Sequence, residues 1–291
     1  MINNKEIEYL YVGGHKCGST WLHDMIVDHP SVSTPKKKEP FFFDSWYERG
    51  FEEYHKLWEG SGIRGEFSTR YFDSRETMKR IHDYNPNLII IINVRSPTDR
   101  IISHYRHQKR LDRNKYKDLK EFIERNKSSV SWSCFGENIT NVLEYFPKSQ
   151  IIVNFFEDIR MFPEDLIRLN YKAIGVDEGH TPLGLKKVSG QGFTPRNQFL
   201  EVVRQSVFHF LYDSGFQNVI NFLRKAGIGR LYRKINSNKE DEVYKIGNDT
   251  ISIFKSDLIL LIDIVNNSFN GKGVLYIDKW IKELDEQDFK G

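Results

Sequence analysis

Cysteine is scarce in this chain of 291 residues, which has only Cys17 and Cys134, far apart in the sequence. Two isolated cysteines exclude a disulfide framework and a cysteine-rich metal site. Long apolar runs are also missing: the run from Ile89 to Val94 is far too short to span a bilayer, and residues 1–6 lack the apolar core of a signal peptide. These absences predict a cytoplasmic protein, although a luminal catalytic fragment cut from its anchor has the same features.

A large excess of one charge is missing as well. The chain has 43 Lys and Arg against 40 Asp and Glu, which gives a formal net charge of +3. So small an excess argues against nucleic acid as the main partner, but it allows a local basic pocket for an anionic cofactor. Hydrophobic residues make up 39% of the chain, enough for one sizeable core, so we expect a single domain over residues 1–291.

The most informative stretch that is present runs from Val12 to Leu22 and is rich in glycine. Residues 9–12 have the pattern of a short buried strand, and residues 21–26 place apolar side chains at helical spacing, so the stretch is a strand-to-helix turn. Glycines at such a turn let backbone N–H groups point at an anion, and the start of the helix adds the positive end of its dipole. With Lys16 as a formal charge, the stretch is predicted to bind phosphate.

Lys16 is not placed as in a nucleotide P-loop, where the lysine directly follows the last glycine, because here it precedes Gly18 by two positions. The segment Lys16 to Leu22 resembles the 5′-phosphosulfate loop of the sulfotransferases that use 3′-phosphoadenosine 5′-phosphosulfate, with His15 in place of the usual Pro and Cys17 in place of the usual Ser or Thr. The alternative is an ordinary turn with an exposed lysine. The resemblance implies six cofactor-binding residues: Lys16, Cys17, Gly18, Ser19, Thr20 and Trp21.

A second motif follows residues 88–94, a β-branched run expected of a central parallel strand that is covered on both faces. Residues 96–99, Ser-Pro-Thr-Asp, supply an N-cap, a proline at the first helical position and an acid placed to close a capping box. In the sulfotransferases an Arg at the strand end and a Ser eight residues later bind the 3′-phosphate, and Arg95 and Ser103 have this spacing. A surface ion pair and a helix-packing serine are the alternatives, but two motifs at the carboxyl ends of two strands favour the cofactor.

A third motif, Gly65 to Phe72, resembles the Gly-Glu-Lys-Ser/Thr-Pro-x-Tyr segment of the same family. The Glu of that segment serves as general base in the heparan-type enzymes, which implies that Glu66 takes the proton from the acceptor. Phe67 stands where Lys is usual and Thr69 where Pro is usual, so one supporting cation is missing. The alternative for Glu66 is an ordinary edge or loop carboxylate.

Three residues are candidates for acceptor binding. Lys37 and Lys38 belong to a Lys-Glu-Pro-aromatic segment that lies near the acceptor cleft in carbohydrate-type sulfotransferases, and a solvated run of charge is the alternative. His107 lies on the helix predicted after residue 96, where it would line the acceptor site, whereas an exposed helical histidine is the commoner case.

The resemblance covers residues 9–158 well and fades after Asn197. The glycine-rich stretch 189–197 is similar to one that closes over the cofactor in bacterial sulfotransferases, which makes Arg196 a candidate second ligand of the 3′-phosphate. The family implies an α/β, three-layer, P-loop-like fold with a central parallel sheet flanked by helices. We expect a cofactor-binding core over residues 1–200 and a helical C-terminal region over residues 201–291.

The implied activity is transfer of a sulfuryl group to a hydroxyl or amine of a small-molecule or glycan acceptor, with a carbohydrate or glycoconjugate favoured, and with adenosine 3′,5′-bisphosphate as the product. Lys16 and the loop backbone would stabilise the departing phosphate. Because no Asp-rich metal motif accompanies the loop, no metal is expected. A P-loop small-molecule or nucleoside kinase and a non-catalytic nucleotide-binding relative are the alternatives. The acceptor's identity and the oligomeric state stay open.

Overall fold

The computed structural model describes residues 6–112, 115–185, 194–195, 197–213, 216, 219, 223, 227–238, 243–268, 273–286 and 288–290. At its centre lies a five-stranded sheet in the order β2-β3-β1-β4-β5, in which all neighbouring strands are parallel. The predicted parallel sheet is confirmed, and the strands that end in the first two motifs, β1 and β4, are direct neighbours. The strands are β1 (Tyr9–Gly13), β2 (Val32–Ser33), β3 (Ile63–Phe67), β4 (Ile89–Val94) and β5 (Ile151–Phe155).

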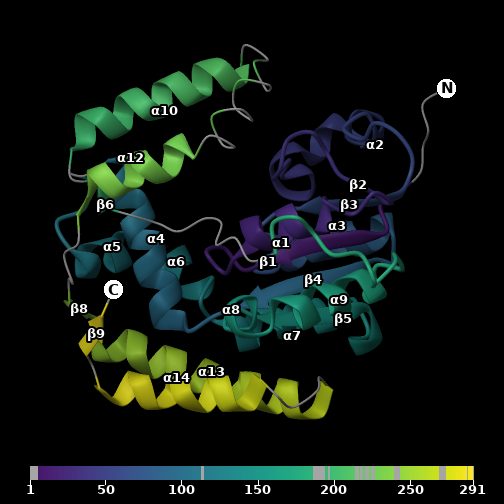
Figure 1. Cartoon of the computed structure of the whole chain (residues 1–291). Helices are drawn as coiled ribbons and strands as arrows, with labels where there is room; N and C mark the ends of the chain where they lie inside the picture. Colours follow the sequence, from purple (N-terminus) through teal and green to yellow (C-terminus); the bar gives the residue numbers. More distant parts are fainter. Residues whose placement is uncertain are drawn as a thin grey trace.

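Helices cover both faces of this sheet, as Figure 1 shows. Tyr9 and Tyr11 of β1 belong to one hydrophobic cluster with α1 and α9, whereas Leu10 and Val12 belong to a second cluster with α3, α4 and α7. Successive side chains of a strand point to opposite faces, so one short apolar strand supplies both clusters. The three-layer arrangement is therefore confirmed. The covering helices are α1 (Ser19–Ile26), α3 (Arg75–Tyr84), α4 (Pro97–Leu111), α7 (Phe135–Leu143) and α9 (Pro163–Ala173).

Helix α4 begins as the sequence predicts, with one exception. The Ser96 hydroxyl accepts the Asp99 backbone N–H at 3.5 Å, and Pro97 is the first helical residue. The Asp99 carboxylate, expected to complete a capping box, instead pairs with the Arg95 guanidinium at 3.2 Å. Shorter elements connect the layers: η1 (Phe42–Trp46), η2 (Tyr47–Arg49), α2 (Phe51–His55), α5 (Leu119–Arg125), α6 (Lys127–Ser131), η3 (Lys148–Gln150) and α8 (Asp158–Met161).

The C-terminal region adds helices outside the three layers. Helix α13 packs against α7 and α14, and the Asp257 carboxylate accepts the backbone N–H groups of Gly136 and Glu137 at 3.0 and 2.8 Å, at the start of α7. Helix α14 is held at the end of β5, where Trp280 donates to Glu157 at 2.9 Å. The elements are β6 (Thr194–Pro195), α10 (Gln198–Asp213), α12 (Ile228–Asn236), β7 (Ser237–Asn238), β8 (Val243–Lys245), α13 (Asn248–Ser268), α14 (Val274–Glu286) and β9 (Asp288–Lys290). Within the described part of the chain, no helix is both long and apolar enough to cross a membrane.

Candidate active site

The turn between β1 and α1 has a backbone that glycine makes possible. Lys16 and Gly18 adopt positive φ angles of 67° and 86°. A Cβ atom on Gly14 would lie only 2.8 Å from the carbonyl oxygen of Asn93, so a side chain there would displace the neighbouring strand. The Gly14 N–H donates to that same carbonyl at 3.1 Å, and the Asn93 side chain donates to the Cys17 carbonyl at 3.0 Å. The loop is thus fixed to β4, with the N-terminus of α1 open beside it.

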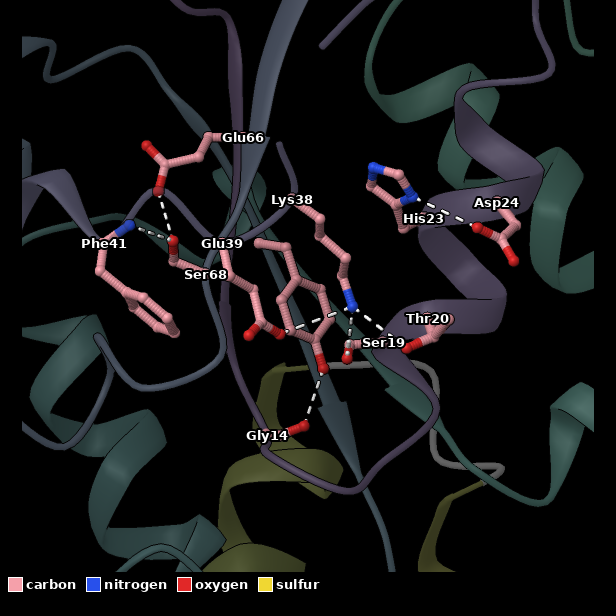
Figure 2. Close-up of polar contacts among 11 residues, drawn as sticks. Gly14, Ser19, Thr20, His23, Asp24, Lys38, Glu39, Phe41, Glu66 and Ser68 are labelled. Carbon is pink, nitrogen blue, oxygen red and sulfur yellow. Dashed lines mark hydrogen bonds and ion pairs between the residues drawn. The ribbon is translucent and has the colours of Figure 1, made fainter. Parts of the chain in front are cut away.

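Lys38 reaches into this loop from a different part of the chain (Figure 2). Its ammonium group donates to the Ser19 and Thr20 hydroxyls at 3.2 Å each, at the first turn of α1, and lies 3.6 Å from the Glu39 carboxylate. Burial lowers the pKa of Lys38. Lys37, its neighbour in sequence, is exposed and takes no part in these contacts. Of the two lysines predicted to meet the acceptor, the structure therefore brings one to the predicted phosphate-binding loop.

Positive charge also gathers around Lys16. Burial, followed by the charge of Arg110 on α4, lowers the pKa of Lys16 to about 8. His107 Nδ1 lies 2.6 Å from an Arg110 guanidinium nitrogen, and burial together with the charge of Lys16 lowers the pKa of His107 to about 4. A neutral imidazole that accepts from Arg110 through Nδ1 carries its proton on Nε2. His107 is thus brought to the loop, and Arg110 is a neighbour that the sequence reasoning missed.

A fully buried arginine lies behind the loop. Arg100 donates to the Ser133 hydroxyl at 2.6 Å and to the Ser129 hydroxyl at 2.7 Å, while its Nη1 has no hydrogen-bond partner among the residues that the structure describes. The rings of His15 and His104 lie beside it with centroids 4.8 Å apart. Burial lowers the pKa of both histidines, that of His104 to about 2, and lowers that of Arg100 only to about 10. The histidines are therefore neutral and the arginine is charged, which adds positive potential beneath the loop.

Arg95 joins the two predicted phosphate motifs. It donates to the Lys16 carbonyl at 3.3 Å, and its guanidinium carbon lies 4.2 Å from the centre of the Phe156 ring. In the described part of the chain its Nε has no hydrogen-bond partner. Ser103 is half-buried two turns into α4, and its hydroxyl makes no hydrogen bond with the described residues. Both predicted 3′-phosphate ligands thus keep donors available at the carboxyl end of β4.

Glu66, the predicted general base, lies in β3 and is fully buried. Its carboxylate accepts the hydroxyls of Tyr54, of Ser68 at 2.5 Å and of Tyr71 at 2.8 Å. Burial raises the pKa of Glu66 and outweighs these three donors, which act in the opposite direction. A raised pKa suits a general base. However, the three hydroxyls that donate to this carboxylate are protein side chains and not an acceptor substrate.

Glu39 is a second carboxylate near the loop, and its side chain is 33% exposed. Figure 2 shows it extending toward Lys38 and Ser19, whereas Glu66 lies with Ser68 farther from the loop. The charge of Glu39 raises the pKa of Lys16, which places the two groups within electrostatic reach of each other. Glu39 was missed by the sequence reasoning, although the Lys-Glu-Pro segment that singled out its neighbours contains it.

Cys17, Trp21 and Arg196 are also predicted to bind the cofactor, but the structure confirms none of them as a side-chain ligand. Trp21 is buried in the cluster beneath α1, and Cys17 is buried with its thiol pKa raised to about 12 by burial, so neither side chain is exposed at the loop. Arg196 lies outside the described residues. Over the described ranges, no group of three or more His, Cys, Asp or Glu side chains is arranged to hold a metal ion.

Comparison with known proteins adds a decisive observation. The family model described as "Sulfotransferase domain" matches residues 7–221, well over half of the chain and including every motif discussed above. The chain belongs to this family.

The curated relatives of this sulfotransferase include enzymes named for heparan sulfate. It is 31% identical over 157 residues to human heparan sulfate glucosamine 3-O-sulfotransferase 6, covering 49% of this chain and 44% of that protein. It is 29% identical over 196 residues to mouse bifunctional heparan sulfate N-deacetylase/N-sulfotransferase 4, covering 58% of this chain and 22% of that protein. The chain thus spans less than half the length of either relative.

Among solved structures, the sulfotransferase is similar to a sulfotransferase from Alicyclobacillus acidocaldarius. The two superpose with a TM-score of 0.57 at 23% identity, over 64% of this chain and 87% of the other. This likeness supports the α/β fold. The positions of Lys38, Glu39 and Arg110 around the loop come from the geometry of this chain alone.

Proposed function

We propose that this sulfotransferase moves a sulfuryl group from 3′-phosphoadenosine 5′-phosphosulfate to a hydroxyl or amine of a carbohydrate or glycoconjugate. The observation that carries the proposal is the gathering of Lys16, Lys38 and Arg95 where two adjacent parallel strands end. Ligands of open α/β sheets bind at such strand ends. The names of the heparan sulfate relatives support a carbohydrate acceptor.

The residues present fit a cofactor with two separate anionic groups, a phosphosulfate and a 3′-phosphate. Lys16, Lys38 and the backbone at the start of α1 would hold the phosphosulfate, and Arg95 with Ser103 would hold the 3′-phosphate. The Nε of Arg95, which has no partner among the described residues, leaves a donor for an anion, and the charge of buried Arg100 adds positive potential beneath the loop. The cofactor supplies the sulfuryl group. The cations would stabilise the negative charge that grows on the departing phosphate.

For the proton of the acceptor we favour Glu39 over Glu66. Glu39 is partly exposed beside Lys38, so an acceptor at the loop can reach it. Glu66 is fully buried and accepts three protein hydroxyls, a setting in which a carboxylate holds Tyr54, Ser68 and Tyr71 in place. The assignment of Glu66 as the base stays a prediction, and exchanging each carboxylate for its amide separates the two.

Phe67 is the feature that most favours a non-catalytic relative, because the family has lysine at this place. Here Phe67 stacks on Tyr11 with ring centroids 5.2 Å apart and planes 12° apart, so the position is part of the core. Lys38 places an ammonium group at the loop, and we infer that it contributes the cation that Phe67 cannot. A non-catalytic protein would bind the bisphosphate and lose nothing measurable on substitution of Glu39 or Glu66.

The test is calorimetric titration with adenosine 3′,5′-bisphosphate in chelator, beside ATP with magnesium. We expect binding of the bisphosphate, weakened about 10- to 100-fold in Arg95→Ala, since a hydrogen bond to a charged group contributes about 1.5–3 kcal/mol. Arg75→Ala is the matched control, because Arg75 pairs with Glu144 on the exposed surface. Binding of ATP and magnesium alone would overturn the proposal and favour a kinase.

A further inference from the structure

Helices α10 and α12 form an antiparallel pair beyond α4. The Asn197 backbone N–H, just before α10, donates to the Asn236 side chain at 2.7 Å, and that side chain donates back to the Asn197 carbonyl at 3.0 Å, at the end of α12. Farther along, the Arg204 guanidinium lies 5.6 Å from the centre of the Tyr232 ring. Figure 1 shows the two helices side by side and away from the central sheet.

Each helix of this pair leaves a stripe of apolar side chains exposed, with the same spacing of i, i+3 and i+7. Phe210 extends the stripe of α10 by a further turn, and Phe210 and Ile235 are both 66% exposed. Side chains at these spacings share one face of a helix. The apolar surface consists of Leu200, Val203, Val207 and Phe210 on α10 and Ile228, Leu231 and Ile235 on α12.

The two stripes emerge on the same face of the pair. Arg204 and Tyr232, which contact each other across it, directly follow Val203 and Leu231. One residue corresponds to about 100° of rotation around a helix. In each helix the apolar stripe is therefore rotated from the Arg204–Tyr232 contact by the same angle in the same sense. For two antiparallel helices, such equal rotations are related by a two-fold axis perpendicular to the plane of the pair, so both stripes face the same side. Seven exposed apolar side chains therefore form one continuous surface rather than two opposite ones.

The same segment is strongly basic. Residues 198–238 contain six Lys and Arg against two Asp and Glu, a formal charge of +4, whereas the whole chain carries +3. The rest of the molecule is thus slightly acidic, and the excess of positive charge is confined to the segment that exposes the apolar surface. Contiguous apolar surface of this kind marks an interaction site.

We propose that the α10–α12 pair is a membrane-binding surface that lies in the headgroup region of an anionic bilayer. An amphipathic helix that combines an apolar face with Lys and Arg binds in this way, through burial of the apolar side chains and attraction to anionic lipid. A second copy of the chain is the less favourable occupant, because it would bring two segments of charge +4 face to face. The proposal does not depend on which reaction the enzyme catalyses.

The test is flotation of the purified chain with vesicles of phosphatidylcholine alone or with about a third phosphatidylglycerol. We expect binding to the anionic vesicles only, and release as the salt concentration rises. The double variant Phe210→Glu with Ile235→Glu should lower the bound fraction at least about tenfold, since it removes apolar contact and adds repulsion. The control variant Ile259→Glu with Leu275→Glu changes exposed apolar residues of α13 and α14 and should bind like the unmodified chain.

Thermal unfolding of all variants verifies that they are folded, which is expected because the four positions are exposed. Equal binding to neutral vesicles, no binding to anionic vesicles, or equal loss in the control variant would each overturn the proposal. So would a dimer, detected by light scattering, that dissociates in Phe210→Glu with Ile235→Glu. That result would assign the surface to a second copy.

Discussion

The loop after β1 and the hydrogen-bonded cluster around Glu66 belong to adjacent strands, yet their polar groups are arranged in opposite ways. Around the loop several cations gather, and Arg95 and Arg100 each keep one nitrogen that has no hydrogen-bond partner among the described residues. Around Glu66, one carboxylate receives three hydroxyl donors and has no access to solvent.

The loop is thus arranged to bind an anionic ligand, whereas protein hydroxyls already fill the hydrogen-bonding capacity of Glu66. Unpaired buried donors cost folding free energy, so a chain that retains them at one site gains from an anion there. A carboxylate saturated by its own protein gains nothing from a further partner. Both sites contain residues predicted from sequence motifs, and only the contacts distinguish them.

The largest expected effect concerns Glu39. Glu39→Gln removes the proposed base and should lower kcat about 100- to 10,000-fold, as is usual for a lost general base, while bisphosphate affinity and the unfolding midpoint change little. Steady-state kinetics with a heparan-type acceptor measure kcat, and calorimetry measures affinity. Unchanged kcat in Glu39→Gln, with a large loss in Glu66→Gln, would return the base to Glu66.

Replacing Lys16 comes next. Lys16→Ala removes the charge proposed to stabilise the departing phosphate and should raise the barrier by about 2–4 kcal/mol, the cost of a lost oxyanion donor. Single-turnover rates measure this barrier directly. Lys37→Ala is the matched control, because Lys37 is exposed and outside the loop contacts. Near-normal turnover in Lys16→Ala would refute the role of Lys16.

Glu66→Gln should act on stability rather than on chemistry. The amide replaces an oxygen that accepts hydroxyls with a nitrogen that donates, so the free energy of unfolding should fall by about 1–3 kcal/mol. Urea unfolding followed by circular dichroism measures the change. Full stability combined with lost turnover would show that Glu66 is the catalytic carboxylate and does not serve mainly to hold its three hydroxyl partners.

The smallest effect is a pH dependence of bisphosphate binding. Burial and Arg110 lower the pKa of Lys16 to about 8, so Lys16 loses its proton as the pH rises past 8 and affinity should fall by up to about tenfold per pH unit. Below pH 8 the charge is present and affinity should level off. Lys16→Arg stays charged and should bind equally at pH 7 and pH 9 by calorimetry. A slope that persists in this variant would assign the titration to another group.

The sequence predicted the parts of the molecule that local rules control. Glycine spacing and strand patterns identified the loop, the parallel sheet and the start of α4. Asp99 departed from its predicted capping role because Arg95, only four residues earlier, pairs with its carboxylate. Lys38, in contrast, could not be placed at Ser19 from sequence, since the contact joins segments that only the fold brings together.

Other expectations stay predictions. They are the role of Arg196, the division into a core and a helical C-terminal region within one domain, and the cytoplasmic location. The C-terminal region also shows what local patterns leave out. Its helices are periodic enough to predict, but the contact of Asp257 with the start of α7 depends on packing between segments more than 100 residues apart.

The contact of Lys38 with Ser19 and Thr20 has a consequence for the cost of binding. An ammonium group that already orders both hydroxyls fixes their rotamers before any anion arrives. Less side-chain entropy is then lost on association, which leaves more of the interaction free energy for affinity. The first turn of α1 is in this sense preorganised by a residue from outside its own motif.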